Sequence, residues 1–381
     1  MESHVKLRHS ESSSEAAANA VPRRAGGITD VADDPALLRL MMDDGEQSST
    51  LWQPTAYWRG YSERISRELA CSGLASFRTN QRLLKGFGSG GVPEPALPSS
   101  AWKRLVWYTL EELPGVRQLL AEQRRILKAE YEHHKDLRRL HAQLAMDEIA
   151  RAFPQVKPPP GLANGGADDA FMWRGHVLVP AFVMYLSRVA DFYTRVPAQR
   201  VTSIFEIGPG FGLSSLAHLA LNPGLKIIVN VDIVPVLYLS TQYLKSISGI
   251  EVVDYRASRG RKTITLDQAR DRARVYQLAP WQLTQLEGPV DFFFNAFSFQ
   301  EMECDVCRNF ASEVLRVTNG GVMLHSSVGG HKTGAGGQRA PVTLAFLQSL
   351  FSHVYTKVIE LDGLWTRLYG GDPRMTRLMT R

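Results

Sequence analysis

A short apolar segment that runs directly into three glycines constrains the fold of this chain more than any other feature. The segment 202–214 reads TSIFEIGPGFGLS, and it places Gly208, Gly210 and Gly212 between an apolar run and a helical pattern that starts at Leu213. Glycines at a strand-to-helix turn let the backbone bend tightly and approach a ligand closely. The exposed amides at the start of the helix suit an anionic or polar group. The segment therefore predicts a ligand-binding turn, with a G-x-G-x-G spacing that differs from the G-x-G-x-x-G of dinucleotide-binding folds.

Short apolar and β-branched runs alternate with helical patterns from about residue 171 onward. Strands that alternate with helices predict βαβ units and a mostly parallel, doubly wound sheet. Upstream, the periodicity predicts a helix over 56–72 and mostly helical structure over 101–152. The predicted fold class is therefore α/β with a helical N-terminal region. The expected strands are 204–207, 226–231, 250–253, 291–294 and 322–324.

Composition shifts divide the chain into three parts. Residues 1–50 are rich in Ser, Ala and acidic side chains without a sustained apolar period, which predicts a disordered tail. Residues 51–160 form the helical region, which could cap an acceptor site. A Pro- and Gly-rich linker follows at 158–166, and 170–381 is the predicted ligand-binding domain.

Charge and apolar content exclude several classes of protein. No stretch approaches the roughly 18 uncharged apolar residues of a membrane-spanning helix, and the polar N-terminus lacks the apolar core of a signal peptide. Three cysteines fit a reducing compartment, so we expect a cytoplasmic protein without a membrane partner. Cys304 and Cys307 have no second ligand pair, and no metal site is expected. The net charge of +6 over 381 residues is mild and argues against nucleic acid as the partner.

Two acidic residues flank the glycine turn. Glu206 lies two residues before Gly208, and Asp232 ends the next predicted strand. An acid at the position of Asp232 can accept both ribose hydroxyls of a nucleoside. The sequence alone leaves open a turn without a ligand and a nicotinamide-dependent dehydrogenase.

With both acids, the glycine turn resembles class I S-adenosylmethionine (SAM)-dependent methyltransferases. The resemblance implies a Rossmann-like sheet with SAM as the cofactor. It places the methionine part of SAM over Gly208, Gly210 and Gly212, its amine near Glu206 and its ribose at Asp232.

A second segment resembles the sugar O-methyltransferase family. It reads DFFFNAFSFQEM over 291–302 and matches an N-x-x-S-x-x-E-M pattern, and the stretch 231–244 is similar to an acid–Pro–Tyr-Leu stretch of that family. In an open α/β sheet, ligands bind beyond the carboxyl ends of the strands, so Asn295 and Glu301 are expected beside the glycine turn. The resemblance implies methyl transfer to a hydroxyl of a sugar or glycoside.

A hydroxyl acceptor needs a base to remove its proton. The candidates on loops after strands are Glu301 and His325, with His331 ranked lower. Two alternatives to a small-molecule O-methyltransferase remain, namely a nucleic-acid methyltransferase and a SAM-binding protein without catalysis. The segment NAFS, in place of the [DN]-P-P-[YF] of base N-methyltransferases, argues against the first alternative.

Overall fold

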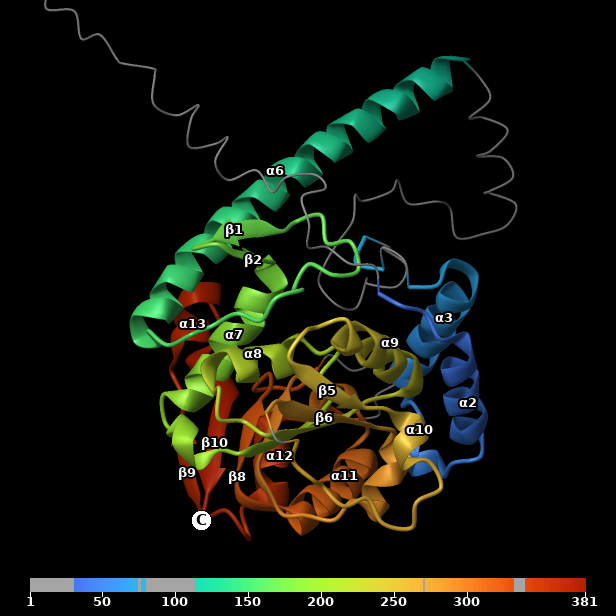
Figure 1. Ribbon diagram of the computed structural model, residues 1–381. Helices are drawn as coiled ribbons and strands as arrows, with labels where there is room; N and C mark the ends of the chain where they lie inside the picture. Colours follow the sequence, from blue (N-terminus) through green and yellow to red (C-terminus); the bar gives the residue numbers. More distant parts are fainter. Residues whose placement is uncertain (1–30, 75–76, 80–113, 270, 332–339) are drawn as a thin grey trace, which may run out of the picture.

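The computed structural model of the chain describes residues 31–74, 77–79, 114–269, 271–331 and 340–381. An eight-stranded sheet lies at the centre of the described part, with helices on both of its faces (Figure 1). Its strand order is β5-β6-β4-β3-β7-β8-β10-β9, and a separate hairpin pairs β1 with β2. The strands are β1 (Phe171–Trp173), β2 (His176–Leu178), β3 (Ser203–Ile207), β4 (Ile227–Val231), β5 (Ile250–Val253), β6 (Ala273–Leu278), β7 (Val290–Ala296), β8 (Thr318–His325), β9 (Lys357–Glu360) and β10 (Thr376–Thr380).

The sheet confirms the predicted fold class. All its strand pairs are parallel except those of β10, which runs antiparallel to both β8 and β9. The strand β3 lies between β4 and β7, so the carboxyl ends of these three parallel strands meet at one edge of the sheet.

Helices cover both faces of the sheet because its strands are apolar on both sides. The helices α7, α8 and α9 pack on the face to which Ile204 and Phe292 point, and α11 and α12 pack on the opposite face with Phe205 and Phe293. The described helices are α2 (Pro35–Glu46), α3 (Ala56–Ser72), α6 (Pro114–Ala152), α7 (Pro180–Tyr193), α8 (Leu213–Leu221), α9 (Val234–Lys245), α10 (Tyr255–Ser258), α11 (Cys304–Val317), α12 (Leu344–Phe351) and α13 (Leu364–Tyr369).

Residues 1–50 were predicted to form a disordered tail, and for residues 31–50 this prediction was wrong. Residues 1–30 lie outside the described residues. Residues 35–46 form α2, which begins with a proline after the capping side chain of Asp34. Leu37 and Met41 are fully buried against the body. Outside this apolar face, acidic side chains pair with arginines that follow β5. Asp34 bonds Arg256 and Asp44 bonds Arg259, each at 2.6 Å. The acidic residues of α2 thus pair with arginines that are far away in the sequence but adjacent in the fold.

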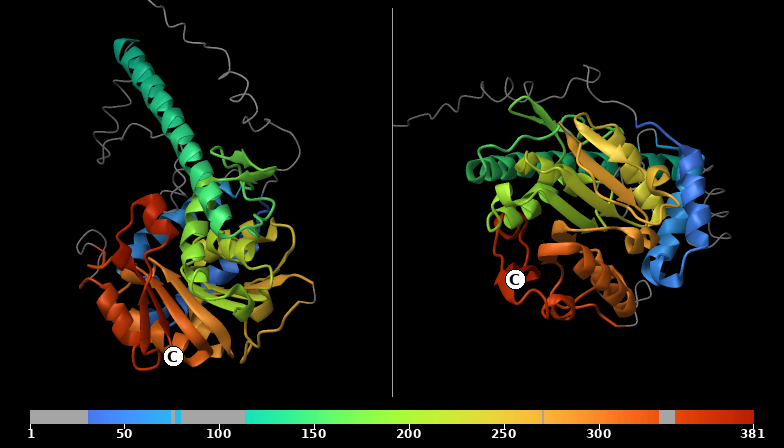
Figure 2. Two further views of the ribbon diagram at one scale, coloured as in Figure 1. Left: turned by 90° about the vertical axis from the view of Figure 1, so that its left-hand side faces the viewer. Right: turned by 60° about the horizontal axis from the view of Figure 1, so that its bottom comes forward.

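The helix α6 packs on α7 near its carboxyl end, while its other end projects away from the sheet (Figures 1 and 2). Its buried side includes Met146 and Ile149, whereas Leu137, Leu140 and Leu144 are exposed. No helix in the described part combines the length and apolar character needed to cross a membrane.

Candidate active site

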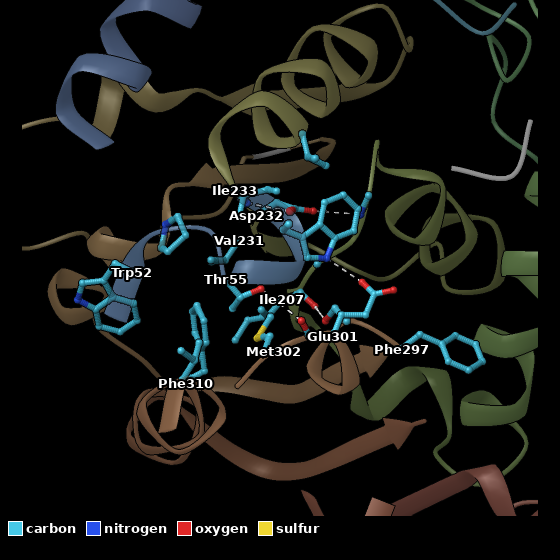
Figure 3. A pocket seen from close by; sticks show the side chains of 18 of the residues that line it. Trp52, Thr55, Ile207, Val231, Asp232, Ile233, Phe297, Glu301, Met302 and Phe310 are labelled. Carbon is cyan, nitrogen blue, oxygen red and sulfur yellow. Dashed lines mark hydrogen bonds between the residues drawn. The ribbon is translucent and has the colours of Figure 1, made fainter. Parts of the chain in front are cut away.

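A pocket of about 180 Å³ opens beyond the carboxyl ends of β3, β4 and β7. Figure 3 shows Asp232 and Glu301 between Trp52 and Phe310 at one end and Phe297 at the other. The wall also includes α7 and the start of α3, which belongs to the predicted cap. The residues lining the pocket include Trp52, Gln53, Thr55, Trp58, Tyr185, Arg188, Ile207, Gly208, Gly210, Val231, Asp232, Ile233, Pro280, Ala296, Phe297, Ser298, Glu301 and Phe310.

The glycine turn is fixed against the end of β7. Gly208 has a φ of +76°, and a Cβ atom there would lie 2.6 Å from the hydroxyl oxygen of Ser298. Ser298 Oγ donates to the Ile207 carbonyl at 2.6 Å, and Asn295 Nδ2 donates to the same carbonyl at 2.9 Å. Only glycine permits this close approach, which leaves the backbone of the turn on the pocket wall. Gly212 lies outside the wall, where its Cα faces Leu244.

Asn295 does not line the pocket. It is buried at the end of β7, where its amide bonds Ile207 and Ser298, the latter at 2.6 Å. Its neighbours Ala296 and Phe297 form the wall in its place. The structure therefore gives Asn295 a supporting position, in which it joins two strand ends.

Asp232 lies at the end of β4, as the sequence predicted, and its carboxylate lines the pocket. One oxygen accepts the Gly210 amide at 3.2 Å, and the other accepts the Ile233 amide at 2.8 Å. Burial nevertheless raises the pKa of Asp232 to about 8, because these two bonds only partly replace water. A ligand that donates hydroxyl hydrogens would stabilise the charged form.

Glu206 lies beneath the pocket and does not form its wall. Its side chain is 1% exposed, and Oε2 has no hydrogen-bond partner among the described residues. Burial raises the pKa of Glu206 to about 8, and the Ser214 side chain and, to a smaller extent, the positive charge of Arg188 partly oppose this rise. A contact with a cofactor amine would need the side chain or the turn to shift.

Glu301 joins the predicted helical region to the predicted ligand-binding domain at the pocket. Its Oε2 accepts a hydrogen bond from Trp58 Nε1 at 2.9 Å, and its backbone carbonyl accepts one from Thr55 Oγ1 at 3.3 Å. Burial raises the pKa of Glu301 to about 7, while the bond from Trp58 lowers it. A carboxyl with this pKa is half ionised near neutral pH and can accept a proton there.

The two candidate histidines do not reach the pocket wall. His325 is 1% exposed, its Nδ1 contacts Thr376 Oγ1 at 2.6 Å, and its ring packs edge-to-face on Phe297 and Trp365. Burial lowers the pKa of His325 well below its usual value, so this position suits a core histidine better than a base. His331 packs edge-to-face on Tyr57, and the segment 332–339 after it lies outside the described residues.

Sequence reasoning missed several residues of the wall. Arg188 is a single cation in the apolar helix PAFVMYLSRVADFY, a pattern that could have marked it as special. Trp58 and Tyr185 come from helices before the glycine turn, so their meeting with Glu301 depends on tertiary packing. In the described part, no group of three or more His, Cys, Asp or Glu side chains is placed to hold a metal ion.

Comparison with known proteins gives similarity in fold alone. No protein-family model matches the chain, and no curated protein matches it. The similar solved structures include magnesium protoporphyrin IX methyltransferase from Synechocystis PCC 6803 with bound SAM (8% identity, 52% of this chain and 79% of that chain, TM-score 0.32). Phosphoethanolamine N-methyltransferase 1 from Haemonchus contortus (11%, 63% and 48%, 0.33) and the pyocyanin biosynthetic protein PhzM (11%, 90% and 71%, 0.32) are further examples. At these values the similarities carry no conclusion about activity or acceptor.

Proposed function

We propose that this protein is a SAM-dependent methyltransferase that acts on a hydroxyl group of a small molecule. One observation carries the proposal. The glycine turn after β3, the carboxylate of Asp232 after β4 and the carboxyl of Glu301 after β7 all line one pocket.

The pocket wall fits the parts of the cofactor. Gly208 and Gly210 expose backbone that the methionine part can approach closely. The carboxylate of Asp232 accepts two backbone amides and is otherwise buried, and two ribose hydroxyls would add donors to it. Ile233 and Pro280 form an apolar wall beside Asp232 that suits a purine ring.

Bound SAM would supply a methyl group made electrophilic by the adjacent sulfonium. Glu301 would accept the proton of the acceptor hydroxyl, because it is the carboxyl group of the pocket wall that remains when Asp232 holds the ribose. Trp58 holds that carboxylate through the indole N–H and so fixes its direction.

We propose a sugar or glycoside as the acceptor. Two features support this class, namely the similarity of 291–302 to sugar O-methyltransferases and the aromatic rings of Trp58, Tyr185 and Phe297 on the wall. Ring faces can pack on the C–H faces of a sugar, while Glu301 meets one of its hydroxyl groups.

Calorimetric titration with SAM and S-adenosylhomocysteine (SAH) tests the cofactor. Asp232→Asn should weaken binding about 10- to 100-fold, because the ribose hydroxyls lose a charged acceptor. Asp254→Asn is a matched control, since Asp254 also follows a strand of the sheet and caps a helix but does not line the pocket. Binding of NAD without binding of SAM would refute the proposal. Transfer of labelled methyl groups to a panel of sugars and glycosides then tests the acceptor class.

A further inference from the structure

Arg188 presents a cation to the pocket without any anion beside it. It lies on α7 and lines the wall, yet its guanidinium makes no hydrogen bond or ion pair with the described residues. Its Nε is buried and unsatisfied. The charge of Glu206 acts on the pKa of Arg188, but the two side chains form no ion pair.

Three aromatic rings surround this guanidinium. Its central carbon lies 4.8 Å from the ring centre of Phe297, 5.3 Å from that of Trp365 and 5.4 Å from that of Tyr185. Ring faces attract the positive charge but accept none of its five N–H donors in the way a carboxylate does. The arginine is therefore held in place while its donors stay unmatched.

The backbone of Phe297 indicates that this arrangement is specifically built. Phe297 has a φ of +67°, which is uncommon for a residue with a Cβ atom, and its amide donates to the His325 carbonyl at 2.7 Å. Such a conformation persists only where the surroundings enforce it, and it occurs mostly at functional sites. The ring of Phe297 lies at the end of the pocket (Figure 3). This conformation places it against Arg188.

Arg188 is half-buried, and leaving its buried Nε without a partner among the described residues is costly, a cost that an anion paired with the guanidinium would partly offset. We propose that Arg188 binds a carboxylate of the molecule that occupies the pocket. The inference rests on the proposed function, and it adds an acid-binding subsite at the Phe297 end. The carboxylate could belong to the amino-acid part of the cofactor or to an acidic acceptor such as a uronic acid.

Binding measurements on Arg188→Met and Arg188→Lys separate these two sources. The probes are SAH, 5′-methylthioadenosine, which lacks the amino-acid part, and glucuronate and glucose added in the presence of SAH. Arg174→Gln is the control, because Arg174 also stacks on a ring, at 4.6 Å from Trp173, but lies outside the pocket. Thermal melting of each variant checks that it folds, and the lysine variant retains the charge if the methionine variant does not fold.

A carboxylate from the cofactor predicts that Arg188→Met weakens SAH binding about 10- to 100-fold while binding of 5′-methylthioadenosine is unchanged. If the carboxylate belongs to an acidic acceptor, Arg188→Met should bind SAH as tightly as wild type. Its affinity for glucuronate should fall by a similar factor, while its affinity for glucose should be unchanged. If Arg188→Met binds SAH as tightly as wild type, and glucuronate binding is absent or unchanged, the proposal is wrong. Failure of the wild-type protein to bind SAH would instead overturn the proposed function.

Discussion

Replacing Trp58 with Phe should move the pH dependence of methyl transfer, because Trp58 donates the hydrogen bond that favours the ionised form of Glu301. Burial raises the pKa of Glu301 to about 7, although the hydrogen bond from Trp58 lowers it. A hydrogen bond to a charged group contributes about 1.5–3 kcal/mol, and one pKa unit corresponds to about 1.4 kcal/mol. The pKa should therefore rise by about 1–2 units in Trp58→Phe.

The rate of a reaction that needs an ionised base rises with pH through the pKa of that base and then levels off. In the wild-type enzyme the rise should centre near pH 7, and in Trp58→Phe it should lie at higher pH with a similar plateau. Glu301→Gln should lower kcat about 10²–10⁴-fold with little change in SAH affinity, since the amide cannot accept the proton. The assay is transfer of labelled methyl groups to an accepted sugar across pH 5 to 10.

Thr55→Val is a matched control, because it removes a hydrogen bond to the backbone carbonyl of Glu301 and leaves the carboxyl group untouched. A rise near pH 4.5 in the wild-type enzyme, or an unmoved profile in Trp58→Phe, would show that the Glu301 carboxyl is not the titrating base. Full turnover by Glu301→Gln would exclude it outright and bring His331 forward as the next residue to test.

Three further predictions concern the turn, the N-terminal helix and pH. Gly208→Ala should weaken SAH binding at least tenfold by calorimetry, because its Cβ would overlap Ser298. Gly249 also has a positive φ but open space around it, so Gly249→Ala should leave binding unchanged. Leu37→Ala and Met41→Ala should each lower the free energy of unfolding in urea by about 2–5 kcal/mol, and deletion of residues 31–46 should lower the melting temperature, a result that an independent tail would not give. The ligand-free protein should lose stability as pH rises from about 5 to 8. Burial raises the pKa values of Asp191 and Glu301 to about 7 and of Glu206 and Asp232 to about 8, so the folded state keeps protons on four carboxyl groups that the unfolded state has lost. Burial lowers the pKa values of His218 and His325, and these two groups oppose the trend below about pH 6.5, whereas Asp34, lowered to about 2, is charged throughout this range. A urea midpoint that increases with pH would contradict this reasoning.

The sequence was sufficient where the signal is local. The glycine turn, the acid at the end of β4 and the helix at 56–72 depend on neighbouring residues, and all lie where they were expected. The strand β6 was missed because its segment, ARVYQL, interrupts its apolar residues with Arg274 and Gln277. It lies between β4 and β5, so 250–253 is an edge strand next to β6 and has no contact with β4 in the sheet order.

Long-range contacts explain the remaining differences. The helix α2 carries a capping aspartate and an apolar face that the sequence displays, but its acidic residues looked solvated because Arg256 and Arg259 are more than 200 positions away. His325 lies at a strand end as predicted. Its burial depends on Thr376 and Trp365, which come from later elements and could not be placed beside it from spacing alone.

The position of β10 has a consequence for the order in which the protein can assemble during synthesis. The strand β9 lies at the edge of the sheet, and β10 separates it from β8. A growing chain is made from its N-terminus, so β9 emerges before the strand that anchors it. The strand β10 begins with Thr376, which contacts His325 behind the pocket. The half of the sheet behind the Phe297 end of the pocket should therefore mature last, after residues 376–380 have left the ribosome, and nascent chains stalled before that point should bind SAH poorly.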